Sequence, residues 1–543
     1  MASRVEAGAL AARGRGRVTS QIALGVALVA LTATFHVWRM AQTPGWDPQE
    51  GYNLDLAWNL LHGRLRLFAL TQVFIQHPPL YYLQLALAIR VFGYGIVAAR
   101  ALSAVYATLT SALLLLVGRR LLGMDTALWA AAVYAVAPVM LEDTRWGYSY
   151  GLLALVGMGV FWLGWEALKA SDMTRARRWL YAAALLAGLA AYCDYVGAAW
   201  IALIALVGLR WGWRQALAAL GIGAGTLGAG LLALLALSPG VFWADALSVG
   251  SRAGGGNPLV QLIVLLLNYE RFLTVDAWLL LGVVGLFLVR ATPARGYLLG
   301  AAGLLGLVIL KARPVGPSLH TVTPLLPLLA LGAGVALAAA AGALFTWAAR
   351  WLEPLDKRLA RSQVVRPDGG APGSIWMRTL TALLVFVILG APLAMAGAGD
   401  VVGLSGTLVT PQDALLATPG DAQATQRYII THARSGNLVL ASPQIAWALD
   451  HPDGADSLKS ADMTQAVAYS GQAAAFYPAG LPRDRWAFDV SLGRARYVIV
   501  DDLLRSLAQP DQLPALEPLL ARAERWPVVF RQGQYVIYEQ PGV

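Results

Sequence analysis

Long apolar runs, separated by short polar segments, dominate the chain up to residue 397. Runs of about 17–25 apolar residues are long enough to cross a hydrocarbon core of about 30 Å. We predict about eleven transmembrane helices, at residues 21–41, 97–118, 125–141, 150–168, 179–195, 196–209, 216–237, 276–289, 297–311, 319–346 and 376–397. The chain is therefore predicted to be a polytopic α-helical membrane protein.

Two apolar segments need a separate interpretation. Residues 179–209 are too long for one span and short for two, so we predict a tight hairpin that turns near Asp194. The run 79–92 is too short to cross and carries Arg90, which favours a helix along the membrane interface.

After residue 397 the pattern changes to that of a soluble domain. Alternating and β-branched apolar residues predict strands at 437–441 and 496–500, and a strand pair on either side of 531–534. Residues 420–434 and 502–525 have helical patterns. We therefore predict a small α/β domain at 398–543, whose role is not evident from its residues.

The basic residues predict the orientation in the membrane. Arg13, Arg15 and Arg17 precede the first span, and further arginine-rich loops follow at alternate ends of the spans. Because positive residues are enriched in cytoplasmic loops, residues 1–20 are predicted to be cytoplasmic and the protein to be a multi-pass protein of the cell membrane. An odd number of spans then places 398–543 outside the cytoplasm, and 43–96 becomes the first outer loop of the membrane domain 21–397.

Composition agrees with this class of protein and excludes others. Of the 543 residues, 58% are apolar and only 13% are charged, about half the share in soluble domains, which excludes a disordered chain. The single cysteine, Cys193, excludes a disulfide scaffold. The pI of about 9.7 reflects basic loops between apolar runs, so we predict contact with membrane lipids and not with nucleic acid.

Ionisable residues gather at the outer ends of the predicted spans. A transporter coupled to ions usually has such residues near the middle of the bilayer, whereas an enzyme working at the outer face needs them at that face. The pattern favours the enzyme. The residues of this outer group are Asp47, Glu50, His77, Glu142, Asp143, Arg145, Asp194, Asp245, Glu270, Arg271, Lys311, Arg313 and His320.

The first outer loop has the densest group of candidate functional residues. Asp47-Pro48-Gln49-Glu50 is typical of a helix start with a capping box, which by itself explains both carboxylates. The loop also contains His77-Pro78-Pro79-Leu80-Tyr81-Tyr82, in which His77 either contacts substrate or bonds a backbone group at the interface. Nearby aromatic residues are explained by an interfacial belt, or by stacking on a sugar.

These motifs resemble those of the GT-C-type glycosyltransferases, which use a sugar linked to a lipid phosphate. The pattern is most similar to protein O-mannosyltransferases and lipid A aminoarabinose transferases. The matching features span most of 46–335: the helix start at Asp47, the HPPLYY run, Phe92-Gly93, Ala98-Ala99-Arg100, Gly118 to Leu121, the segment Glu142 to Tyr148, and Arg313 with Thr323 to Leu328.

The resemblance implies transfer of a sugar from a polyprenyl-phosphate donor, with inversion, by a base among the outer carboxylates. The family usually has an adjacent Asp-Glu pair before a tyrosine, with the Asp as the base. This chain has Gln49 at that Asp position, so we predict Glu50 or Asp47 as the base.

The remaining outer residues are predicted to bind the substrates. Lys311, Arg313 and His320 would hold the donor phosphate, although lysine and arginine also reach lipid headgroups at such positions. Candidate substrate-binding residues are His77, Tyr81, Glu142, Asp143, Arg145 and Asp194, although Arg145 could instead pair with its neighbouring carboxylates. No cofactor is required; a divalent cation is possible because Asp47, Glu50 and Asp143 carry oxygen ligands.

Two other functions remain open at this point. The chain could transport or flip a lipid-linked saccharide, or it could be a catalytically inactive relative in envelope glycan assembly, as Gln49 suggests. The residues do not define the sugar, and the acceptor could be a protein, a lipid or a glycan.

Overall fold

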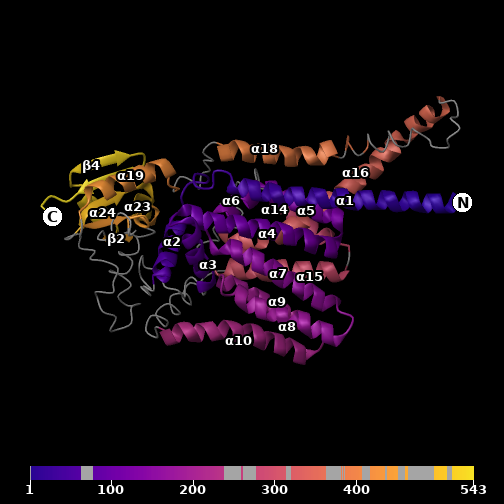
Figure 1. The fold of residues 1–543 in the computed structure, drawn as a ribbon, viewed down its shortest axis with the longest axis horizontal. Coiled ribbons are helices and arrows are strands. Elements are labelled where there is room, and N and C mark those ends of the chain that lie inside the picture. The colour runs from indigo at the N-terminus through magenta and orange to yellow at the C-terminus, as the bar shows by residue number, and fades with distance from the viewer. Residues whose placement is uncertain are drawn as a thin grey trace.

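The computed structural model shows a bundle of helices with a small domain containing a sheet beyond one end (Figure 1). We call this end, where α2 (Pro48–Leu61) and α3 (Pro79–Phe92) also lie, the site end, and the other the opposite end. The structure describes residues 2–62, 78–237, 259–260, 277–290, 292–312, 319–362, 381, 383–384, 386–405, 416–434, 437–449, 459–462, 495–509 and 516–542.

The helices of the bundle occur where apolar runs predict them. Six described helices are long and apolar enough to cross a membrane, and a seventh span results if α5 and α6 cross together. The bundle comprises α1 (Ala2–Val37), α4 (Ile96–Leu122), α5 (Met124–Val136), α6 (Pro138–Arg145), α7 (Ser149–Lys169), α8 (Met173–Ala190), α9 (Ala198–Leu209), α10 (Trp213–Leu237), α14 (Ala277–Leu288), α15 (Thr292–Ala312), the 3-10 turn η2 (Leu319–Leu325), α16 (Leu326–Ser362), the π-helical turn η3 (Phe386–Gly390) and α18 (Ala391–Ser405).

Some predicted spans are shorter than a bilayer. Helix α9 has 12 residues, which at 1.5 Å per residue is about 18 Å of helix, and α14 is described only from Ala277 onward. The described residues therefore contain six or seven spans by length and composition, and not eleven. Helix α18 also continues through residue 398, where the sequence predicted the start of the soluble domain.

Breaks between helices coincide with residues that end them. Pro138 lacks an N–H and separates α5 from α6, whose axes differ by 62°. The hairpin predicted near Asp194 is present: α8 ends at Ala190, and Asp194 caps the 3-10 turn η1 (Tyr195–Gly197) before α9. The interfacial segment forms α3 (Pro79–Phe92), a helix of 14 residues as predicted.

Glycines allow two helices of the bundle to pack in backbone contact. A Cβ at Gly285 of α14 would lie 1.7 Å from the carbonyl oxygen of Gly332 of α16, which is closer than any side chain can be. Small residues of this kind let helices approach without a driving force from water, as is usual in membranes.

The predicted α/β domain is confirmed in its strands. Its sheet has the order β2-β1-β3-β5-β4, with β1 parallel to β2 and β3, and β5 antiparallel to β3 and β4. The elements are α19 (Pro419–His432), β1 (Leu438–Ala441), α20 (Pro443–Ala446), β2 (Lys459–Asp462), β3 (Ala495–Val500), α23 (Asp502–Leu507), α24 (Leu516–Ala523), β4 (Val528–Gln532) and β5 (Tyr535–Glu539). The single helix predicted at 502–525 is two helices.

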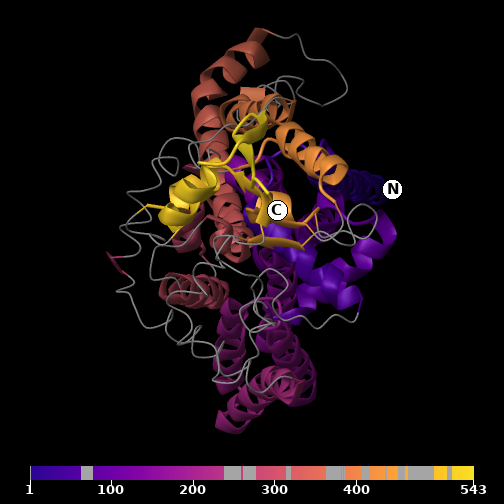
Figure 2. The ribbon, with the colours of Figure 1, turned by 90° about the vertical axis from the view of Figure 1, so that its left-hand side faces the viewer.

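This domain lies over the site end of the bundle, against the loop that carries Trp46 (Figure 2). Trp46 and Ala417 exchange two backbone hydrogen bonds of 2.9 and 3.0 Å. The rings of Trp46 and Trp447 meet edge to face at 5.5 Å, and the Tyr94 hydroxyl donates to the Trp447 carbonyl at 2.8 Å. The loop that carries Asp47 is therefore fixed from two sides, by the bundle and by the C-terminal domain.

The contact between α2 (Pro48–Leu61) and α20 has no room for a side chain at Gly51. A Cβ there would lie 2.2 Å from the Pro443 carbonyl oxygen, a backbone atom that cannot move aside cheaply. Gly51→Ala should weaken docking of the C-terminal domain by about 1–3 kcal/mol, the usual range for overpacking. The ratio of docked to undocked protein should therefore fall at least about fivefold. We expect limited proteolysis to release the domain faster. Gly420→Ala, which meets open space, is the control, and equal cleavage of both variants would contradict this contact.

Candidate active site

Asp47 begins the helix α2 at the site end. Its carboxylate accepts a hydrogen bond of 2.7 Å from the Gln49 N–H, and the Glu50 carboxylate accepts one of 3.3 Å from the Asp47 N–H. These bonds form the predicted capping box, with Pro48 at the first helical position. The capping box fixes the backbone of Asp47, so its carboxylate has a defined position.

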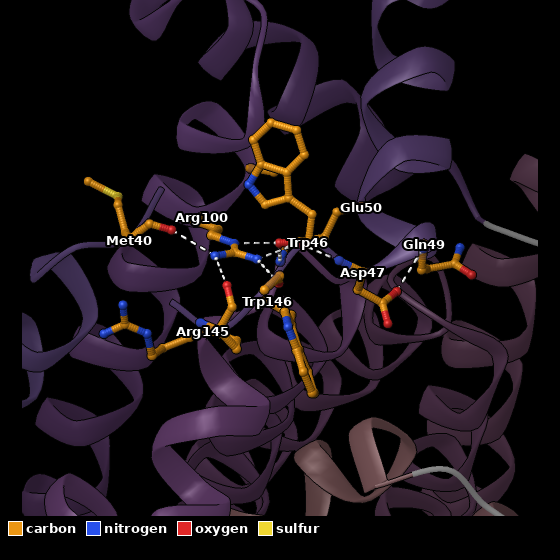
Figure 3. A network of polar contacts seen from close by, with 12 residues as sticks. Met40, Trp46, Asp47, Gln49, Glu50, Arg100, Arg145 and Trp146 are labelled. Atoms are coloured by element: carbon orange, nitrogen blue, oxygen red, sulfur yellow. Dashed lines mark hydrogen bonds and ion pairs between the residues drawn. The ribbon is translucent and has the colours of Figure 1, made fainter. Parts of the chain in front are cut away.

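Glu50 forms a buried ion pair with Arg100 of α4 (Figure 3). The Nε and Nη2 atoms of Arg100 donate to the two carboxylate oxygens at 2.7 and 2.6 Å, and neither side chain is more than 1% exposed. The remaining N–H groups of Arg100 donate at 2.8 Å to the carbonyls of Met40, Pro44 and Gly45. Arg100 thus joins α4 to both Glu50 and the chain that leads to Asp47.

Both oxygens of Glu50 are fully engaged by donors. Besides Arg100, the Gly147 N–H donates to Oε1 at 2.9 Å and the Asp47 N–H donates to Oε2. A carboxylate with two acceptor bonds on each oxygen has no lone pair left for a substrate proton. Of the two carboxylates predicted as the base, the geometry therefore favours Asp47.

A second set of hydrogen bonds extends from this pair to α3. Asn53 of α2 donates to the Gly147 carbonyl at 2.7 Å and accepts from the Tyr82 hydroxyl at 2.9 Å. Gly147 itself has no room for a side chain, since a Cβ would lie 2.5 Å from that of Ala99. The segment 146–148 is thereby held between α2 and α4.

Asp47 remains partly exposed, unlike Glu50. Its carboxyl has a pKa of about 6 instead of 3.8, because burial and the charge of Glu50 raise the pKa by more than hydrogen bonds from Tyr148 and Gln49 and the charge of Arg100 lower it. Tyr148, which immediately precedes α7, is close enough to Asp47 to affect the pKa of its carboxyl. A carboxylate with a pKa near 6 is a stronger base than an ordinary aspartate and is still ionised at pH 7.

The predicted residues of α6 are buried at the same end. Arg145 donates to the carbonyls of Phe35, Trp38 and Thr43, with 2.7 Å to each of the last two from Nη2. These bonds hold the chain between α1 and α2, and the predicted role of Arg145 in binding the sugar stays a prediction. Glu142 and Asp143 are 8% and 3% exposed.

Two other predicted residues, Tyr81 and Asp194, make contacts within the protein, and their roles in substrate binding stay predictions. Tyr81 is fully buried in the core and meets the Tyr82 ring edge to face at 5.5 Å, so its packing explains it without a substrate. Asp194 caps η1 by accepting from the Val196 N–H at 2.9 Å, and it is partly exposed.

The three residues predicted to bind the donor phosphate are described only in part. Lys311 lies in the last turn of α15 and His320 in η2; their backbones are described, whereas Arg313 and also His77 fall outside the described residues. Helix α15 contacts η1 and η2, and η2 contacts α6 and α7. These backbone positions therefore lie at the site end, and the phosphate-binding role stays a prediction.

No metal site is evident among the side chains that the structure describes. In that part of the chain, no three His, Cys, Asp or Glu residues come together as possible ligands. The oxygen atoms of Glu50, one of the three predicted ligands, are occupied by Arg100 and by backbone N–H groups. We therefore assign no step to a divalent cation.

The structure adds residues that the motifs did not assign. Arg100 belongs to the Ala-Ala-Arg motif, but its role as the partner of Glu50 was not predicted. A charged residue five positions into a span with few charges was the available signal, because such a residue needs a partner in the membrane. Tyr148 was part of the Glu142-to-Tyr148 segment of the resemblance but was given no role in the site, and Asn53 was not singled out by any motif.

Comparisons with known proteins bear on the family and the fold. Residues 76–243 match the family described as dolichyl-phosphate-mannose-protein mannosyltransferase, a segment that includes Arg100 and α6 but begins after Asp47. No curated protein matches the chain in sequence.

Two solved structures are similar in fold. ArnT from Cupriavidus metallidurans bound to undecaprenyl phosphate has a TM-score of 0.60 and 17% identity over 96% of this chain and 98% of ArnT. An Archaeoglobus fulgidus oligosaccharyltransferase in complex with zinc and sulfate has a TM-score of 0.51 and 12% identity over 91% of this chain and 70% of its own. The chain is a multi-pass membrane protein with the GT-C fold, and the predicted resemblance is confirmed.

Proposed function

We propose that the chain is a membrane glycosyltransferase that moves a sugar from a polyprenyl-phosphate donor to an acceptor at the outer face of the membrane. The observation that carries the proposal is Asp47: a partly exposed carboxylate of raised pKa, fixed between the bundle and the C-terminal domain. The donor class is supported by the fold shared with ArnT, which was solved with undecaprenyl phosphate.

In the proposed reaction, Asp47 acts as a general base toward the acceptor. The Asp47 carboxylate takes the proton of the acceptor hydroxyl or amine while the acceptor atom forms a bond to the anomeric carbon. The bond from that carbon to the phosphate oxygen breaks, and the polyprenyl phosphate leaves with the bonding electrons. Attack opposite to the leaving group inverts the anomeric configuration, as in inverting glycosidases.

The residues around the base are proposed to stabilise the negative charge of the leaving phosphate and to orient Asp47. The leaving phosphate is a weak base and needs positive charge in place more than it needs an acid. Lys311, Arg313 and His320 are proposed to supply this charge, from segments that lead to the site end. Glu50 and Arg100 do not touch the substrate in this proposal; they hold the loop that orients Asp47.

The raised pKa of Asp47 predicts how the rate depends on pH. The carboxyl of ordinary pKa 3.8 has a pKa of about 6 in the folded protein, so it is protonated and inactive below that pH and ionised above it. We expect kcat/KM to fall about tenfold per pH unit below pH 6 and to level off above it. Transfer rates measured from pH 4.5 to 8 check this, and a rate that stays level down to pH 5 would contradict the assignment of this base.

Cells with and without the gene test the function itself. Mass spectrometry of lipid-linked sugars and envelope glycans should find an accumulated polyprenyl-phosphate sugar and a missing glycan residue when the gene is deleted. The sugar on the accumulated lipid identifies the donor, and the missing glycan identifies the acceptor. Unchanged donor and unchanged glycans would argue against a transferase.

A further inference from the structure

A cavity of about 760 Å³ opens at the opposite end of the bundle, where α7 and α9 end and α15 begins. Helix α7 has 21 residues and therefore spans about 30 Å from Tyr148, beside Asp47, to its last residue, Lys169. This length equals the thickness of a hydrocarbon core, so the cavity lies at the other membrane surface from the candidate active site.

The floor of the cavity is apolar. It is formed by side chains that include Leu203, Leu206 and Tyr297, and the Tyr297 hydroxyl is turned away into a hydrogen bond of 2.8 Å to the Phe161 carbonyl. Gly296 and Gly300, one helical turn apart on α15, contribute no side chains and leave the space open. Leu206 is 54% exposed, so the apolar floor continues to the lipid-facing surface.

Two cations lie at the rim, Lys169 and Arg210. Each is exposed, and each is placed over a tryptophan ring, with Lys169 Nζ 5.3 Å from the Trp165 ring and Arg210 Cζ 6.0 Å from the Trp211 ring. Within the described part of the chain neither one forms an ion pair. The nearest acidic residues along the chain are already paired, Glu166 with Arg120 and Asp172 with Arg175.

We propose that this cavity binds an anionic phospholipid, with its phosphate between Lys169 and Arg210 and an acyl chain over the apolar floor. Two cations above an apolar hollow that opens to the lipid match a molecule with a negative head and an apolar tail. Basic pockets between transmembrane helices are known to bind anionic headgroups in this way. The site is independent of the proposed transfer reaction, since it lies at the other membrane surface.

Native mass spectrometry of the full chain tests the site. After equilibration with equal amounts of dioleoyl phosphatidylglycerol and dioleoyl phosphatidylethanolamine, we expect the wild type to retain about tenfold more of the anionic lipid, given the strength of basic residues near anionic lipids. Lys169→Gln with Arg210→Gln should abolish this preference. Arg177→Gln with Arg178→Gln removes the same charge from exposed positions on α8 outside the cavity and should keep it.

Gly296→Leu provides a test that leaves the charges in place. The position meets open space, so the variant should fold, and its side chain should occupy the cavity and lower retention of the anionic lipid. The proposal is overturned by a wild type without preference, by equal loss in the two charge variants, or by full retention in Gly296→Leu. Displacement of the lipid by millimolar inorganic phosphate alone would likewise overturn it, because the site would then be one for soluble anions.

Discussion

Asp47→Asn should reduce the rate of sugar transfer by about 10²–10⁴-fold, the usual contribution of a general base. Asparagine cannot accept the acceptor's proton, yet it caps a helix as well as aspartate does, so α2 should still begin at Pro48. The measurement is the rate at which purified protein, reconstituted in vesicles, releases polyprenyl phosphate from a polyprenyl-phosphate sugar in the presence of an envelope acceptor fraction.

Two matched variants make the result specific to this carboxylate. Asp47→Ser also keeps a capping side chain without a basic carboxylate and should be as inactive as the asparagine variant. Gln49→Ala changes the adjacent residue, which occupies the family's usual base position, and should retain a rate within about threefold of the wild type, because Gln49 has no acid–base role. Loss of activity in Gln49→Ala with full activity in Asp47→Asn would show that transfer depends on Gln49 and not on Asp47.

Arg100→Met should destabilise the protein by about 3–5 kcal/mol, since it leaves the Glu50 carboxylate buried without its partner. Three backbone carbonyls lose their donors in the same substitution. We expect a lower midpoint of thermal unfolding in detergent and loss of transfer activity, because the loop that carries Asp47 is no longer held. The unfolding midpoint of the purified chain checks the expectation.

Arg120→Gln is the control for this effect. Arg120 pairs with Glu166 at the opposite end of the bundle, and its side chain is 56% exposed. Exposed pairs contribute about 0–1 kcal/mol, so the midpoint should hardly move. Equal midpoints for Arg100→Met and Arg120→Gln would show that the Glu50–Arg100 pair does not hold the site together.

Much of the fold was predictable because the membrane imposes a simple rule. An apolar run must become a helix, since its backbone groups have no other partners in lipid. The positions of the helices and the turn at Asp194 follow directly. Span lengths were harder to predict, because α9 is only 12 residues long although it belongs to a nearly continuous apolar run at 179–209.

The candidate site was predictable in part. The capping box at Asp47 was read from four consecutive residues, because local spacing alone determines it. The choice between Asp47 and Glu50 required tertiary structure, since it depends on Arg100, which is 50 residues from Glu50 in sequence. The docking of Trp447 against Trp46 joins residues still further apart, and no local pattern in the chain points to it.

Gln49 does not by itself imply an inactive protein. It lies two residues from Asp47, and its backbone N–H donates to the Asp47 carboxylate. We propose that the base is Asp47, two positions before the family's usual base position but at the same helix start. Because Asp47 also caps α2, its presence alone does not distinguish an active from an inactive protein, and the Asp47→Asn transfer assay makes that distinction.

The most direct test of the central claim is to follow the sugar itself with isotope-labelled donor, using purified wild type and Asp47→Asn in vesicles at pH 8. We expect a new glycosidic bond of inverted anomeric configuration, seen by NMR, with wild type, and almost none with Asp47→Asn. The claim would be contradicted if labelled lipid crossed the membrane without any new bond, which is the behaviour of a flippase, or if both proteins formed the product at equal rates.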